Sequence, residues 1–257
     1  MKMSKLLIGM AVVVGAVSAF PVLAQEPLPA GGLYAGSPYL GDLRNSLVYG
    51  DIWERPELSK RDRSLITIGV LQALTREELA IHIPRGLDNG LTPAEISEII
   101  LHVTFYAGWP TGVQASLTAA EAFQELGVSI GPLRRAPAES ARVLIVPDQT
   151  GNRAYAAVPK LGELRNSVLF GDVWERPQLL KRDRSLLTMA VLQALYATNE
   201  LRIHIGRALD EYGVTAQEVS ETILHVTFYA GWAAAINAGR LAADAFEERG
   251  VDFSRLQ

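Results

Sequence analysis

The chain contains no cysteine among its 257 residues. Disulfide bonds, thiolate metal ligands, thiol nucleophiles and a lipid-modified cysteine are therefore all excluded. The chain has only four histidines and no excess of basic residues, because 24 lysines and arginines stand against 28 aspartates and glutamates. The basic residues form no stripe, so nucleic-acid binding has no support in the composition. With 49% apolar residues, the chain has the composition and length for one or two packed domains.

Long apolar runs are absent beyond the first 24 residues. Two lysines near the start precede an almost wholly apolar run over 6–23, which ends in the cleavage-site spacing of Val22-Leu23-Ala24. This pattern is typical of a secretory signal peptide at 1–24 that is removed after Ala24. The alternative is an uncleaved anchor, because the run is nearly long enough to span a bilayer. We expect cleavage, a mature protein with no membrane segment, and a periplasmic or secreted location.

Internal repetition is the strongest signal in the sequence. Residues 41–74 and 162–195 are identical at 24 of 34 positions, and LHVTFYAGW at 101–109 recurs unchanged at 224–232. The rare side chains recur with the rest. The four histidines and four tryptophans fall at equivalent positions, which are His82 with His204, His102 with His225, Trp53 with Trp174, and Trp109 with Trp232.

The repeat predicts two tandem all-α domains at 25–128 and 161–257. A proline-containing connector at 129–160 separates them, and its VLIV core could form a short strand. Within the first copy, the apolar run over 65–74 predicts a central buried helix. An amphipathic helix over 76–88 should end before Gly90. Thr92-Pro93-Ala94-Glu95 forms a capping box that opens a helix to about residue 107, and another helix follows over 111–126. We expect about ten helices in two bundles.

Every histidine follows a glutamate by four residues, which places both side chains on one face of a helix. Such a carboxylate can fix the imidazole tautomer and favour its protonated form, so that the histidine donates protons near neutral pH. The plainer alternative is a surface ion pair. A metal site is a further alternative, but no HExxH or other dedicated spacing is present. We therefore predict no metal. The pairs are Glu78–His82, Glu98–His102, Glu200–His204 and Glu221–His225.

Two arginines directly precede the apolar runs of the two copies. Arg63 and Arg184 could each bind a substrate carboxylate through a bidentate guanidinium. The nearby run Trp53-Glu54-Arg55-Pro56 and its copy indicate a rigid loop that braces packing. The two arginines are therefore the candidate anion-binding residues.

The order of these motifs resembles the carboxymuconolactone decarboxylase family. The motifs are F/Y-G-D-x-W-x-R-P-x-L, then R-S-L, E-L-x-x-H, G-(L/V)-T-x-x-E and Y-A-G, and they occur over 40–127 and again over 161–250. The resemblance implies two tandem alkylhydroperoxidase D-like helical domains that associate into rings. Single-domain members of the family form hexamers, so a two-domain chain should form a homotrimer.

The peroxidase branch of this family uses a glutamate and a C-x-x-C pair. Here Thr75 and Glu78 stand in the two cysteine positions and Arg63 stands in the position of the glutamate, so the decarboxylase branch is the better match. That branch removes CO2 from a carboxylated unsaturated lactone without a cofactor.

The resemblance assigns roles by position. Arg63 would bind the substrate anion, His82 would protonate carbon, Glu78 would orient His82, and His102 would share the pocket. The second-copy equivalents are Arg184, Glu200, His204 and His225, and the substrate-binding set also includes Trp109 and Trp232. The expected ligand is a small carboxylate or lactone. The alternative is a non-catalytic exported module that binds small molecules or serves in assembly.

Overall fold

A computed structural model of the protein describes residues 32–131 and 153–256. The expected signal peptide and the expected strand in the connector lie outside these ranges. The chain divides into an N-terminal unit that ends at Asp42 and a second unit, Leu43–Gln257. The described part of the first unit holds a 3-10 turn at Gly32–Tyr34 and most of helix α1, Pro38–Leu43.

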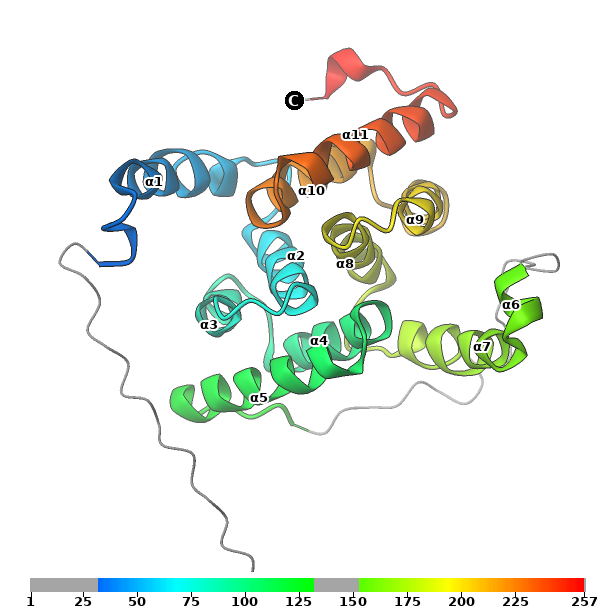
Figure 1. The fold of residues 1–257 in the computed structure, drawn as a ribbon, viewed down its shortest axis with the longest axis horizontal. Helices are drawn as coiled ribbons and strands as arrows, with labels where there is room; N and C mark the ends of the chain where they lie inside the picture. Colours follow the sequence, from blue (N-terminus) through cyan, green and yellow to red (C-terminus); the bar gives the residue numbers. More distant parts are fainter. Residues whose placement is uncertain (1–31, 132–152, 257) are drawn as a thin grey trace, which may run out of the picture. The chain divides into compact units, whose positions relative to one another are not determined.

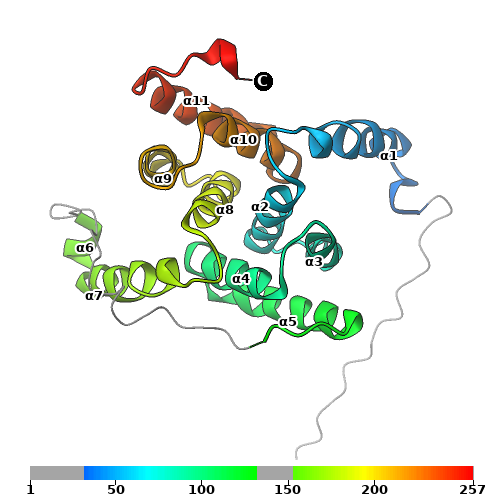
Figure 2. The ribbon, with the colours of Figure 1, turned by 180° about the vertical axis from the view of Figure 1, so that it is seen from behind.

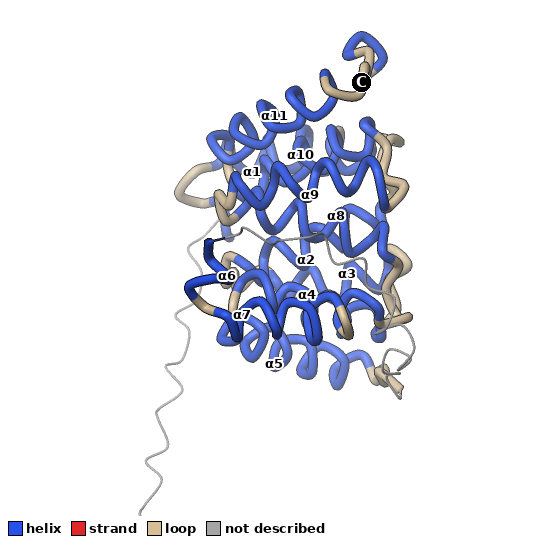
Figure 3. Tube along the Cα trace, turned by 90° about the vertical axis from the view of Figure 1, so that its right-hand side faces the viewer, coloured by secondary structure: helices blue, strands red, loops and turns tan. Residues whose placement is uncertain are grey.

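The described residues contain helices and no strand, so the all-α prediction is confirmed (Figure 3). In each copy a π-helical turn and a short 3-10 turn precede four α-helices. The first copy has turns at Arg44–Tyr49 and Ile52–Glu54, then α2 (Lys60–Ala73), α3 (Leu79–Asp88), α4 (Pro93–Ala107) and α5 (Trp109–Leu126). The second has α6 (Arg153–Ala157) and α7 (Pro159–Leu164), turns at Arg165–Phe170 and Val173–Glu175, then α8 (Lys181–Ala194), α9 (Thr198–Glu211), α10 (Ala216–Ala230), α11 (Trp232–Glu247) and a final turn at Phe253–Arg255.

Helices α2 and α8 form the centre of the second unit. Both are buried from the third residue to the last, as the all-round apolar run predicts. They pack against each other, and α4 and α5 lie on one side of the pair while α10 and α11 lie on the other (Figure 1). Helix α3 packs on α2 and α9 packs on α8 (Figure 2).

The two copies share one hydrophobic core, so the expectation of two separate bundles is wrong. Helix α4 of the first copy packs on α8 of the second, and α10 of the second packs on α2 of the first. The buried side chains of both copies form a single cluster. The reason is that α2 and α8 are apolar on every side and need a neighbour on the face that their own copy leaves open.

The predicted helix ends are confirmed at several places. Thr92 and Thr215 close capping boxes with the glutamates three residues later. Gly108 has φ +95° at the junction of α4 and α5. Such a value suits glycine, and it lets the chain reverse between the two helices without strain. None of the described helices is both long and apolar enough to cross a membrane.

Part of the predicted connector is helical. Helix α6 and the start of α7 occupy residues that the proline content assigns to the linker at 129–160. Pro159 stands at the first position of α7, where its missing N–H costs nothing and its fixed φ suits the helix. Proline there marks a helix start, so the expectation of a non-helical connector over 129–160 is wrong for residues 153–157 and 159–160.

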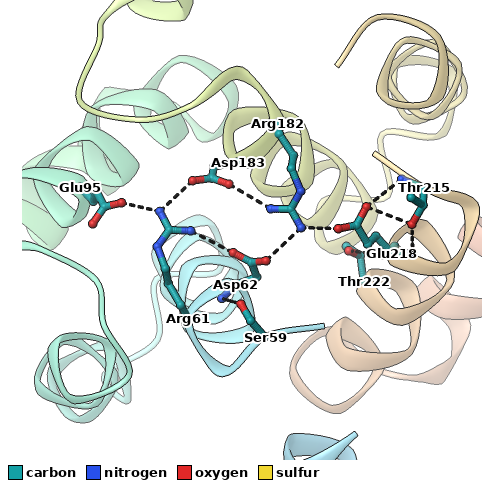
Figure 4. A network of polar contacts seen from close by, with 9 residues as sticks. All are labelled: Ser59, Arg61, Asp62, Glu95, Arg182, Asp183, Thr215, Glu218 and Thr222. Atoms are coloured by element: carbon teal, nitrogen blue, oxygen red, sulfur yellow. Dashed lines mark hydrogen bonds and ion pairs between the residues drawn. The ribbon is translucent and has the colours of Figure 1, made fainter. Parts of the chain in front are cut away.

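Charged side chains join the two copies where α2 and α8 begin (Figure 4). Arg61 donates to Asp62 at 2.9 Å and to Asp183 at 2.7 Å. Arg182 closes the ring by donating to Asp183 at 3.1 Å and to Asp62 at 3.0 Å. Both aspartates are buried. Each arginine also binds the glutamate of its own copy's capping box, which is Glu95 for Arg61 and Glu218 for Arg182. This ring ties the copies in a fixed register.

Candidate functional site

The histidines gather in two aromatic clusters, and each cluster draws on both copies. The His82 cluster combines Trp53 and His82 of the first copy with His225 and Tyr229 of the second. The His204 cluster combines Trp174 and His204 of the second copy with His102 and Tyr106 of the first. The expectation that His82 and His102 share a pocket is therefore wrong. The cause is that α4 and α10 each pack on the central helix of the other copy as well as on that of their own.

The rings of the His82 cluster are held in close contact. The Trp53 and His82 rings stack with centroids 6.2 Å apart, and His225 meets the indole edge-on at 5.1 Å. Tyr229 stands edge-on to His82 at 5.7 Å and accepts a hydrogen bond of 3.0 Å from Trp53 Nε1. The His204 cluster repeats this geometry, with a bond of 2.9 Å from Trp174 Nε1 to Tyr106.

The contacts of His102, the inner histidine of the His204 cluster, favour one tautomer. Nη1 of Arg184 lies 3.4 Å from His102 Nδ1, and Nε2 of His102 lies 2.8 Å from Thr188 Oγ1. Arginine only donates, so Nδ1 must accept. Thr188 donates its own proton to the Arg184 carbonyl at 2.7 Å, so His102 Nε2 carries hydrogen. The matching contacts in the His82 cluster join His225 to Arg63 and Thr67.

Arg63 and Arg184 lie beneath these histidines and have no exposed surface. Arg63 donates to Glu221 at 2.9 Å and to the carbonyl of Arg55 at 3.0 Å. Arg184 donates in the same way to Glu98 and to the carbonyl of Arg176. These guanidiniums are already neutralised by protein carboxylates. The expectation that they bind a substrate anion is therefore corrected.

The glutamates do not pair with their histidines as expected. Glu98 and Glu221 are taken by the arginines. Glu78 and Glu200 are exposed, and no hydrogen bond or ion pair between described residues joins them to His82 or His204. The Nδ1 atoms of His82 and His204 have no partner in the described part of the chain. Spacing of four residues allows such a contact, but here Glu78 and Glu200 are exposed, and Glu98 and Glu221 bind the buried arginines.

All four histidines have lowered pKa values. Burial lowers the pKa of His82 to about 4, with a further contribution from Arg85 and Arg44. Burial and then Arg207 and Arg165 lower the pKa of His204 to about 3. The pKa values of His102 and His225 lie well below the usual range, mainly through burial. The imidazoles are therefore neutral at pH 7. The expectation that a glutamate four residues earlier favours the protonated imidazole is wrong for this structure.

Two further arginines stand at the outer side of each cluster. The guanidiniums of Arg44 and Arg85 lie 4.6 and 4.8 Å from the ring centre of Tyr49, which itself stacks on Trp53. Arg165 and Arg207 lie over Phe170 in the same way, at 4.8 and 5.2 Å. All four are partly exposed. A pair of accessible guanidiniums beside a neutral imidazole can bind an anion and leave the imidazole free to exchange a proton.

Sequence reasoning missed these arginines and the rings of Trp53 and Trp174. One signal could have found Arg85 and Arg207, because each follows its histidine by three residues on the same helix. Trp109 and Trp232, which were expected to bind substrate, lie elsewhere. They are the first residues of α5 and α11 and are 68% and 70% exposed.

Metal ligands do not converge in the described ranges, where no group of three or more histidine, aspartate and glutamate side chains could hold an ion. The Glu–His pairs that could have supplied four ligands are divided between the two clusters.

Comparison with known proteins shows which family shares the motifs of the two copies. The profile of the carboxymuconolactone decarboxylase family matches residues 38–122 and again 159–244. The chain is 45% identical over 82 residues to 4-carboxymuconolactone decarboxylase of Acinetobacter baylyi, which is 32% of this chain and 61% of that protein. It is 30% identical over 86 residues to nitrosuccinic acid decarboxylase of Metarhizium robertsii, which is 33% of this chain and 60% of that protein. The chain thus spans about six-tenths of each relative. With two matches in tandem, the chain belongs to the carboxymuconolactone decarboxylase family.

Proposed function

We propose that the protein is a cofactor-free decarboxylase that acts on a small carboxylated lactone or a related carboxylic acid. The observation that carries the proposal is the composition of the two clusters. Each brings a neutral, nearly buried histidine against aromatic rings and within the field of two partly exposed arginines. The names of the two relatives support the reaction class.

The outer arginines serve as the anion-binding groups. Arg44 and Arg85 hold the negative charge of the substrate, and they stay close to that charge as the reaction moves it. The bond between the carboxylate carbon and the adjacent ring carbon breaks, and CO2 leaves. The electron pair of that bond passes into the conjugated lactone carbonyl and forms an enolate. A fixed pair of guanidiniums stabilises the enolate oxygen without reorganisation of solvent.

His82 supplies the proton that completes the reaction. The positive charges of Arg44 and Arg85 contribute to its low pKa. A bound anion offsets these charges, so the pKa of His82 rises when the substrate binds. The imidazolium then gives its proton to the enolate carbon and takes another from solvent. His204 has the same role beside Arg165 and Arg207.

The test replaces both histidines at once, because one intact cluster would mask the loss of the other. His82→Gln with His204→Gln keeps the size of the side chains but removes their acid–base function. We expect a loss of about 10²–10⁴-fold in kcat toward a panel of carboxylated γ-lactones. CO2 release and loss of ultraviolet absorbance report turnover.

The controls separate catalysis from folding. Circular dichroism must show that the double variant keeps its helices, and replacing exposed Glu78 and Glu200 with glutamine should leave kcat within about twofold. A folded double variant with the wild-type rate would contradict the role of the histidines. A wild-type protein that binds these lactones without releasing CO2 would indicate a binding module.

A further inference from the structure

The two clusters share one plan but differ in the partners of their outer arginines. In the His82 cluster, Arg85 binds the hydroxyl of Tyr49. Neither Arg44 nor Arg85 forms an ion pair with a carboxylate of any described residue. In the His204 cluster, Arg207 donates two hydrogen bonds to one carboxylate oxygen of Glu211, at 3.0 and 2.9 Å, and also binds the hydroxyl of Tyr212.

The difference arises at the ends of two equivalent helices. Glu211 stands where the first copy has Asn89, and Tyr212 is an inserted residue with no counterpart. Asn89 is uncharged and donates to Ser64 at 2.9 Å. Tyr212 stacks on Trp174 with ring centres 5.2 Å apart, so the indole has a further ring packed against it. The described part of the His82 cluster has no equivalent ring.

The clusters therefore differ by one unit of charge and by one aromatic ring. Among the described residues, the outer part of the His82 cluster holds the guanidiniums of Arg44 and Arg85 with no carboxylate paired to either, whereas the outer part of the His204 cluster holds Arg165, Arg207 and Glu211. Their inner parts match closely, because the buried arginine, threonine and glutamate repeat with similar distances. The outer parts alone can give the two clusters different ligands.

We propose that Glu211 and Tyr212 determine ligand selectivity, so that the two clusters are not equivalent sites. The His82 cluster takes acids with two carboxylates, which match its two guanidiniums that have no carboxylate partner among the described residues. The His204 cluster takes smaller acids with one carboxylate, because Glu211 occupies one guanidinium and Tyr212 occupies space beside the indole. A difference between the clusters in the substrates they turn over rests on the function proposed above, whereas a difference in the anions they bind does not.

Fluorescence quenching tests the charge difference without any knowledge of the substrate. All variants carry Trp109→Phe and Trp232→Phe, because these exposed indoles would dominate the signal. Adding W174F leaves Trp53 as the reporter of the His82 cluster, and adding W53F leaves Trp174 as the reporter of the His204 cluster. Iodide measures access of an anion, and acrylamide measures access of a neutral molecule. The ratio of the two quenching constants isolates the effect of charge.

We expect this ratio to be about three- to fivefold higher at Trp53, as one additional positive charge at short range in water would give. Glu211→Gln should raise the ratio at Trp174 to that level. Asp210→Asn is the matched control, because Asp210 precedes Glu211 but pairs with Arg249. It should leave the ratio unchanged. Asn89→Glu should lower the ratio at Trp53, and Tyr212→Ala should raise acrylamide quenching at Trp174.

A second measurement compares succinate with butyrate as protectants against iodide. Succinate should protect Trp53 at least fivefold better than butyrate, and the preference should disappear at Trp174. It should return there in Glu211→Gln. Equal ratios at the two indoles, or a Glu211→Gln variant that behaves as Asp210→Asn does, would overturn the proposal.

Turnover provides the last measurement and keeps the two proposals apart. His204→Gln leaves only the His82 cluster active, and His82→Gln leaves only the His204 cluster. The first variant should prefer dicarboxylated lactones by at least fivefold in kcat/KM relative to the second. Different quenching without CO2 release would support selective binding and contradict the decarboxylase function. CO2 release with equal preferences in both variants would contradict the selectivity alone.

Discussion

The ion pair between Arg63 and Glu221 supports the fold of the His82 cluster, and its disruption should be costly. Both side chains are 0% exposed. Glu221 accepts a hydrogen bond of 2.9 Å from Arg63 and hydrogen bonds of 2.7 and 3.0 Å from Arg55. One carboxylate therefore neutralises the buried guanidinium of Arg63 and also binds that of Arg55. Glu221→Gln keeps the shape but leaves Arg63 without its counter-charge. Breaking a buried pair on one side typically costs about 3–5 kcal/mol.

Urea unfolding followed by circular dichroism measures this loss directly. The expected cost is a large part of the roughly 5–15 kcal/mol that stabilises a typical domain, and it corresponds to a fall in Tm of about 6–20 °C. Glu54→Gln is the exposed control. Glu54 pairs with Lys60, both side chains are more than half exposed, and such pairs contribute about 0–1 kcal/mol.

A second comparison distinguishes a structural arginine from one that binds substrate. Replacing Arg63 with methionine and Glu221 with leucine removes both charges and should recover most of the lost stability. Arg63→Lys should lower the free energy of unfolding and leave KM of the folded enzyme nearly unchanged. A Glu221→Gln variant as stable as Glu54→Gln, together with a raised KM in Arg63→Lys, would refute this reasoning and return Arg63 to the substrate.

Three further predictions concern pH, assembly and processing. The pKa is lowered to about 4 for His82 and to about 3 for His204 in the folded protein. As pH falls below about 6.5, these histidines therefore bind protons in the unfolded chain before they do so in the folded protein. Stability should therefore be constant above that pH and decline by up to about 1.4 kcal/mol per pH unit for each histidine between pH 6 and 4; a flat profile in urea unfolding would contradict the burial. We also propose a homotrimer, because Trp109, Val113 and Leu117 form an exposed apolar stripe on α5; light scattering should give three times the chain mass, and a clean monomer at micromolar concentration would exclude it. Finally, the mature protein should begin at Gln25 and be exported; N-terminal mass spectrometry that finds Met1 in a membrane fraction would favour an anchor.

Much of the fold could be predicted from the sequence because the signals were local. The capping boxes at Thr92 and Thr215, the glycine at 108 and the buried run over 65–74 each depend on neighbouring residues alone. The face on which a helical residue lies also follows from local spacing, so the sequence shows that α2 and α8 are apolar on every side. Which copy covers which face is a long-range property, and two copies that share the same apolar pattern give no signal that distinguishes packing within a copy from packing between copies.

The same limit explains the errors at the site. Spacing showed that Glu98 and His102 share a helix face, but it could not show that Arg184 of the other copy takes the carboxylate. It identified Arg63 as unusual because it abuts the apolar run, yet burial turned that feature into a structural role. The outer arginines escaped notice because surface arginines are common, and only the folded chain brings Arg44 and Arg85 to one ring.

Because α4 and α10 each contact the central helices of both copies, the two sites of such a protein can evolve separately once the copies share one chain. A single copy holds only half of each cluster, so a one-copy ancestor would have completed its site by pairing with a second identical chain. In that pair every mutation would appear at both sites together. Once the two copies are joined in one chain, a change at the end of α9 alters one site and leaves the other as it was. Tyr212 and the neighbouring Glu211 have the form of such a change, because they alter the His204 cluster and have no counterpart in the His82 cluster.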